Sequence, residues 1–194
     1  METAAEPTSD VNLVAGRICG SCIACCVLLP VRATGFKKMP STKCEHCRAG
    51  GGCKIYETRP DACRSFNCMW LQAPNLDDVW RPDRSGVLIT EELDDIPEGF
   101  KIRPGFQFMV FAERTALDQP VLAGFIAELV AARVPAFLSI PGPPGCYAAK
   151  LFLNNALSFT VRTGDKARVS AVLQQGYDTL KTFKFKPAPA DLAP

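Results

Sequence analysis

Nine of the ten cysteines in this 194-residue chain lie between Cys19 and Cys68. The first four form the pattern C-x2-C-x2-C-C, and a second C-x2-C follows before three single cysteines. Two residues between cysteines allow a tight turn to aim both thiolates at one metal ion. Unrelated buried thiols do not repeat such a spacing, so the pattern predicts metal binding. The candidate metal ligands are Cys19, Cys22, Cys25, Cys26, Cys44, Cys47, Cys53, Cys63 and Cys68.

The sequence predicts a cytoplasmic protein without a membrane partner. The first residues carry acids where a secretory signal needs a basic start. The most apolar stretch, residues 121–138, is interrupted by Glu128, Arg133 and Pro135, so it does not provide a membrane span. Thiols in a reducing cytosol stay reduced, and clustered cysteines there bind metal or perform redox chemistry more often than they form disulfides.

The cysteine-rich part of the chain is also its basic part. Residues 16–70 contain nine Lys or Arg against three acids, a net charge of +6, whereas the whole chain carries +2. A basic patch is typical of nucleic-acid binding. It also compensates the negative charge of four thiolates around Zn²⁺ or an iron–sulfur cluster. Compensation is the favoured interpretation, because the segment lacks the interleaved aromatics of a base-stacking surface.

Apolar patterning predicts an α+β fold in two parts. Residues 16–73 lack a sustained apolar period and are expected to form a small loop-rich metal module, in which metal replaces a core. Residues 74–185 are expected to form an α+β domain of two helices on an antiparallel or mixed sheet. One helix begins near Pro120 and the other after the N-cap Asp165. The expected strands are 86–90, 107–112, 136–140 and one or two within 147–161, and the expected disordered ends are 1–15 and 186–194.

Residues 17–70 resemble a known family. The run Cys19 to Cys26, followed by Gly52-Cys53-Lys-Ile-Tyr56-Glu-Thr-Arg59-Pro60-Asp-Ala-Cys63-Arg64-Ser-Phe66, is similar to the CxxCxxCC proteins, which are described as zinc- or iron-chelating. The flagellin lysine methylases have a related cysteine pattern and are thought to hold an iron–sulfur cluster, which implies an enzymatic alternative. Cys47 and Cys68 exceed the commonest family pattern. The resemblance covers no later part of the chain.

Two kinds of metal centre fit these cysteines. Cys19, Cys22 and Cys25 reproduce three positions of the bacterial ferredoxin run, whose fourth cysteine is replaced here by Leu29. A [4Fe-4S] cluster then needs a remote ligand such as Cys53 or Cys63. Zinc takes four thiolates, and nine cysteines suffice for two zinc sites with one left over. The spacing favours the cluster slightly, because an extra adjacent cysteine suits it better than paired zinc knuckles.

Other polar residues accompany the cysteines. Arg59 and Arg64 are predicted to donate hydrogen bonds to thiolate or sulfide around the cofactor, and Arg59-Pro60 alternatively forms a rigid turn over Tyr56. His46, the only histidine, is predicted to lie beside the centre or at the surface rather than to ligate zinc. Cys146 stands apart and is expected to be a small buried hydrophobe.

These observations predict a metal-binding cysteine-cluster protein with a structural, redox or metal-handling role. One alternative is an iron–sulfur-dependent group-transfer or redox enzyme, and another is a zinc-scaffolded nucleic-acid-binding module. The chain lacks G-x4-G-K-[ST], G-x-S-x-G and H-E-x-x-H, and no catalytic residue is identified, which leaves the question of an enzyme open. The partners are a metal ion or cluster, with a protein partner as an open alternative and nucleic acid as the less favoured one.

Overall fold

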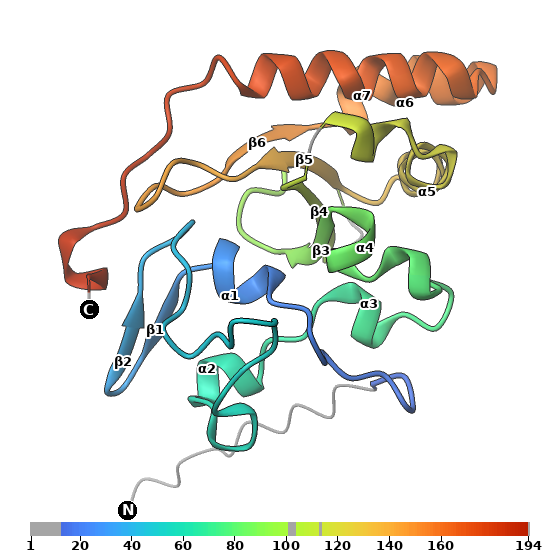
Figure 1. Cartoon of the computed structure of the whole chain (residues 1–194). Helices are drawn as coiled ribbons and strands as arrows, with labels where there is room; N and C mark the ends of the chain where they lie inside the picture. The colour runs from blue at the N-terminus through green and yellow to red at the C-terminus, as the bar shows by residue number, and fades with distance from the viewer. Residues whose placement is uncertain (1–12, 101–103, 113, 194) are drawn as a thin grey trace, which may run out of the picture.

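A mixed four-stranded sheet lies at the centre of the molecule (Figure 1). The computed structural model describes residues 13–100, 104–112 and 114–193. The strand order is β3 (Val87–Glu92), β4 (Gly105–Val110), β5 (Ala136–Ile140) and β6 (Ala149–Phe152). The outer pairs are antiparallel, whereas β4 and β5 are parallel, with Phe106 opposite Ala136. A long connection between β4 and β5 is required by this parallel pairing.

Helices cover one face of the sheet (Figure 1). They are α5 (Pro120–Ala131), α6 (Asn154–Thr163) and α7 (Lys166–Leu180). Alternate strand residues such as Ile89, Phe108 and Leu138 are buried in the core shared with these helices. Such alternation follows from the two-residue period of a strand. None of the helices that the structure describes is long and apolar enough to cross a membrane.

The opposite face of the sheet supports the cysteines. Leu88 and Met109 point to this side and form a second buried cluster with Ala24 and Leu28 of α1 (Ala24–Leu28). In Figure 1, α1 and the segment that follows it lie across the sheet from α5, α6 and α7. The sheet therefore separates a helical layer from a layer that contains the cysteines.

The cysteine segment, residues 16–73, consists of short elements and loops. Before α3, its buried apolar residues are Ala24, Leu28, Pro40 and Cys47. A segment of this length with so few buried apolar groups has little hydrophobic stabilisation of its own. Besides α1, its elements are β1 (Val31–Ala33), β2 (Phe36–Lys38), η1 (Tyr56–Thr58), α2 (Asp61–Arg64) and α3 (Met69–Gln72).

Short helical turns connect these layers. The remaining elements are η2 (Asp78–Trp80), α4 (Pro82–Ser85), η3 (Arg114–Asp118) and η4 (Ala190–Leu192). The predicted α+β class is confirmed, as are the strands near 86–90, 107–112 and 136–140. The helix that starts at Pro120 is also confirmed, and the Asp165 side chain accepts a hydrogen bond from Arg168 N as an N-cap.

Of the one or two strands predicted within residues 147–161, one is present, and a helix that was not predicted follows it. β6 ends at Phe152 and α6 follows, so three helices cover the sheet instead of two. Leu153 and Leu157 are both fully buried, and their spacing of four residues suits a helix. The Asn154 side chain accepts from Ala136 N at 2.8 Å and donates to Val134 O at 2.8 Å, which fixes the start of α6 beside β5.

The C-terminal residues differ from the expected disordered tail. Leu192 is buried, and Tyr147 N donates a hydrogen bond to Lys186 O. Asp191 forms an ion pair with Arg32 of β1 at 2.6 Å. A single leucine and backbone pairing hold this segment without an apolar run. Of the predicted disordered N-terminus, residues 1–12 lie outside the described residues.

Candidate metal centre

Every cysteine of the cysteine segment is a free thiol in the structure. Cys19 and Cys22 lie in the loop before α1, and Cys25 and Cys26 lie in its first turn. Cys63 lies in α2 and Cys68 is the N-cap residue of α3. The remaining three are in the loop between β2 and η1, at positions Cys44, Cys47 and Cys53.

Backbone hydrogen bonds form the turns that the two C-x2-C spacings predict. Cys22 N donates to Cys19 O at 2.9 Å, and Cys47 N donates to Cys44 O at 3.1 Å. The two turns are linked, because Cys44 N donates to Cys26 O at 3.0 Å. Cys47 also forms an isolated antiparallel bridge with Cys53. Residues far apart in the sequence thus bring their thiols to one place.

Seven of the nine thiols line one cavity of about 130 Å³, here called the larger cavity. A cavity holds a water molecule once it reaches roughly 10–15 Å³, so this one has room for a group of several atoms. In the described part of the chain, no group of three His, Cys, Asp or Glu side chains is arranged to hold a metal ion. The thiols surround the cavity and are not gathered around one ion position. The seven thiols that line the cavity are Cys19, Cys22, Cys25, Cys26, Cys44, Cys53 and Cys63.

The adjacent cysteines Cys25 and Cys26 interact directly. Their Sγ atoms are 3.9 Å apart, which permits a thiol hydrogen bond. This contact lowers the pKa of Cys26 to about 6 and raises the pKa of Cys25, since one thiol holds the proton that stabilises the other thiolate. Cys26 is therefore the thiol of the segment best prepared to be a thiolate at neutral pH.

The other shifted thiols favour the protonated form. Burial raises the pKa of Cys22, Cys47 and Cys63, and it raises the pKa of Cys68 to about 11. A thiol bound to a metal is deprotonated outright, because the ion's charge exceeds these effects. Binding of a metal at this site would therefore release protons and create several thiolates at once.

Lys38 is a buried cation beside the thiols, and no sequence motif marks it. Its residue is only 4% exposed, and its Nζ donates to Met39 O at 3.1 Å and Thr42 O at 2.8 Å. Among the described residues it forms no ion pair with a carboxylate. Burial lowers its pKa, while the nearby Cys44, Cys26, Cys25 and Cys47 raise it. In the sequence, only strand alternation distinguishes Lys38 from the exposed Lys37.

Only one of the two predicted arginines lies with the thiols. Arg59 lines the larger cavity, and its guanidinium carbon lies 3.8 Å from the Tyr56 ring centroid. Its Nε donates to Tyr56 O at 2.8 Å, so the expected rigid turn over Tyr56 is also present. Arg64 is exposed, pairs with Asp61 and does not line the larger cavity. Its predicted role beside the cofactor has no geometric support.

His46 and Cys146 have different positions. His46 lines the larger cavity and packs against Phe36, with ring centroids 5.4 Å apart. It is thus beside the thiols, as one of the two predicted placements had it. Cys146 is half-buried, lies outside the larger cavity and pairs with Pro187 through a backbone bridge. It provides a control cysteine for every experiment on the cluster.

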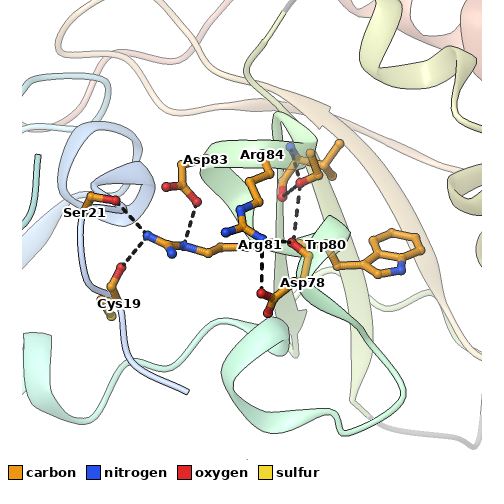
Figure 2. A network of polar contacts seen from close by, with 9 residues as sticks. Cys19, Ser21, Asp78, Trp80, Arg81, Asp83 and Arg84 are labelled. Carbon is orange, nitrogen blue, oxygen red and sulfur yellow. Dashed lines mark hydrogen bonds and ion pairs between the residues drawn. The ribbon is translucent and has the colours of Figure 1, made fainter. Parts of the chain in front are cut away.

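Arg81 ties the first cysteine turn to the sheet-forming part of the chain (Figure 2). Its Nη2 donates to Cys19 O at 3.1 Å and to Ser21 Oγ at 2.9 Å. Its Nε lies 2.8 Å from Asp83 Oδ1, which orients the guanidinium. Figure 2 also shows the separate pair of Arg84 with Asp78, at 3.1 Å. Sequence reasoning had no signal for Arg81, because its partners are about 60 residues away.

Arg81→Ala is expected to lower the free energy of unfolding by roughly 1.5–3 kcal/mol, since hydrogen bonds from a charged group of limited exposure are lost. If the thiols hold a metal, the same variant should release it faster, because Cys19 loses its backbone anchor. Urea unfolding and metal release to a chromophoric chelator measure the two effects. Arg84→Ala is the matched control, because exposed ion pairs contribute at most about 1 kcal/mol. Equal effects of the two substitutions would contradict this role of Arg81.

Gly52 packs the loop before Cys53 against the first cysteine turn. Its φ is +80°, and a Cβ there would lie 2.7 Å from Gly20 O. Gly52→Ala is therefore expected to cost more than the roughly 1–2 kcal/mol of the left-handed conformation alone. Gly50→Ala is the control, since a Cβ at Gly50 meets nothing within 4 Å, and it should change stability by less than about 0.5 kcal/mol. Thermal unfolding of both variants checks the difference.

Comparison of the chain with protein-family models, with curated proteins and with solved structures finds no match. The resemblance to the CxxCxxCC proteins therefore rests on the cysteine run and on the residues around Cys53 and Cys63.

Proposed function

We propose that this chain is a metal-binding cysteine-cluster protein, which holds an iron–sulfur cluster or zinc through the thiolates of residues 19–68 in a structural, redox or metal-handling role. One observation carries the proposal. The buried ammonium of Lys38 lies among four thiols and has no carboxylate partner among the described residues.

A buried charge without a countercharge is costly, and natural proteins rarely retain one. The groups around Lys38 that can become negative are the thiols of Cys25, Cys26, Cys44 and Cys47. Burial favours the protonated form of Cys47, so this countercharge is incomplete without metal. A metal that binds these sulfurs converts them into thiolates, and the ammonium then offsets the negative charge of the site.

The small apolar core of the cysteine segment supports the same proposal. Ala24 and Leu28 contact the sheet face, but the loop from Met39 to Ile55 buries only Pro40 and Cys47 among its apolar residues. Metal binding supplies folding free energy directly in such segments. The six glycines between positions 16 and 52 further increase the entropy that folding must overcome.

The larger cavity supports a cluster somewhat better than a single ion. A volume of about 130 Å³ surrounded by seven thiols suits a group of several atoms. Zinc requires four thiolates at about 2.3 Å, so the thiols would have to rotate inward to bind it. An iron–sulfur cluster in this position would supply one-electron transfer, whereas zinc would supply structure. Arg59 and Tyr56 would remain at the wall of the site.

The test is anaerobic purification followed by a visible spectrum and by quantification of iron, zinc and acid-labile sulfide per chain. We expect bound metal in the wild type and in Cys146→Ser, and a large loss of metal in Cys19→Ser and Cys63→Ser. A brown protein with sulfide identifies a cluster, and a colourless protein with zinc identifies a zinc site. Wild-type protein that is folded and protease-resistant without any metal would overturn the proposal.

A further inference from the structure

Two cavities, and not one, adjoin the cysteines. A second cavity of about 30 Å³, here called the inner cavity, lies toward the sheet, where Leu71, Pro82 and Leu88 form part of its wall. Cys68 lines the inner cavity only, whereas Cys26, Cys44 and Cys53 line the larger cavity only. The thiols thus differ in the space that they face.

Cys68 belongs with the first cysteine turn. The thiols that act electrostatically on Cys68 are Cys19 and Cys22. These two, together with Cys25 and Cys63, also line the inner cavity, and all four line the larger cavity as well. Cys68 is the N-cap residue of α3 and packs against both buried clusters. The inner set joins Cys68 to the three thiols of the run Cys19 to Cys25 and comprises Cys19, Cys22, Cys25 and Cys68.

The remaining thiols form a second set around Cys26. Cys47 lies near Cys26 and Cys44. Cys53 is bridged to Cys47 through the backbone. Cys63 interacts with three members of this group. The outer set comprises five thiols: Cys26, Cys44, Cys47, Cys53 and Cys63.

The adjacent pair Cys25 and Cys26 is where the sets divide. A zinc ion or a [4Fe-4S] cluster takes four thiolates, so one centre leaves five of the nine cysteines without a role. Neighbouring residues on one helical turn point in different directions, which places one sulfur in each set. Their Sγ separation of 3.9 Å allows the two centres to be close without sharing a ligand.

Trp70 gives independent support for a ligand in the inner cavity. Its residue is 6% exposed and lines this cavity, and its Nε1 has no hydrogen-bond partner among the described residues. A buried donor without an acceptor costs roughly 1–3 kcal/mol, so it calls for an explanation. The guanidinium groups of Arg17 and Arg81 lie 5.3 and 5.7 Å from its ring centroid, and neither can accept a hydrogen bond. A metal-bound thiolate or sulfide in the inner cavity would be an acceptor within the same space.

We propose that the chain holds two metal centres, an inner one on Cys19, Cys22, Cys25 and Cys68 and an outer one on Cys26, Cys44 and Cys53, which line the larger cavity only, with Cys47 or Cys63 as the fourth ligand. This inference rests on the proposed function and extends it from metal binding to the number and composition of the centres.

The first measurement is anaerobic native mass spectrometry of the wild-type chain as purified. Two centres add two separable mass increments to the chain, and the increments identify each as a single ion or a cluster. The second measurement compares Cys68→Ser with Cys44→Ser by metal and sulfide content per chain, because Cys68 lines the inner cavity only and Cys44 the larger cavity only. Cys146→Ser is the matched control, because Cys146 lies outside both cavities.

We expect complementary losses. Cys68→Ser should lose the inner centre and keep the outer one, and Cys44→Ser should do the reverse, so that the two losses together equal the wild-type content. A wild type that carries one centre, or variants that lose the same metal, would overturn the inference while leaving the proposed function intact. A metal-free wild type would instead overturn the proposed function. If either variant fails to fold, the wild-type mass decides the number of centres by itself.

Discussion

Removal of the metal is expected to unfold residues 17–70 while the sheet of β3 to β6 keeps its structure. Structural zinc sites in small peptides contribute apparent binding free energies of roughly 10–16 kcal/mol at neutral pH. The cysteine segment has few buried apolar groups to replace such a contribution. The sheet, in contrast, has its own core with α5, α6 and α7. Metal loss should therefore affect the two faces of the sheet very differently.

Hydrogen exchange measured by mass spectrometry, on metal-loaded and chelated protein under anaerobic conditions, checks this expectation. The amides that form the cysteine turns, such as Cys44 N and Gly52 N, should lose protection in the chelated protein. Peptides from β5 and α7 serve as the internal control and should exchange at nearly unchanged rates. Retained protection across residues 19–68 without metal would show that side-chain packing alone folds the segment.

The periodic part of the chain could be predicted from its sequence with good accuracy. Strand alternation located β3, β4 and β5, and Pro120 and Asp165 marked the starts of two helices. α6 was missed, because a short apolar run such as Leu151 to Leu157 fits a strand or a helix equally well. What decides in the structure is the Asn154 side chain, whose partners lie 18 and 20 residues earlier. Sequence spacing does not contain that contact.

The cysteine spacing predicted which residues gather, but not how they divide. Tight turns at Cys19–Cys22 and Cys44–Cys47 are local, so a motif reveals them. The inner and outer sets that we propose depend on where α3 places Cys68 relative to α1, which is a tertiary relation. Arg81 and Trp70 act on the first turn from other elements for the same reason. Of the two arginines that the motif marked, Arg59 faces the thiols and Arg64 faces solvent.

Lys38→Met is expected to weaken metal binding by about two orders of magnitude. Breaking a buried ion pair by removing one partner costs roughly 3–5 kcal/mol, and 3 kcal/mol corresponds to about a hundredfold change in affinity. Methionine keeps the apolar stem of Lys38 but leaves the thiolates without their buried countercharge. In the metal-free protein the effect should be much smaller, because only part of the countercharge is then present, chiefly on Cys26, whose pKa is lowered to about 6. Apparent stability without metal should thus change little.

Competition against a chromophoric chelator measures the affinity, and urea unfolding of chelated protein measures the second effect. Lys37→Met is the matched control, because Lys37 lies on the same strand with its side chain exposed and loses the same formal charge. If long-range attraction to the basic segment held the metal, both substitutions would lower the affinity alike. Both losses of affinity would then vanish at high salt. A loss confined to Lys38→Met and insensitive to salt places the countercharge inside the site.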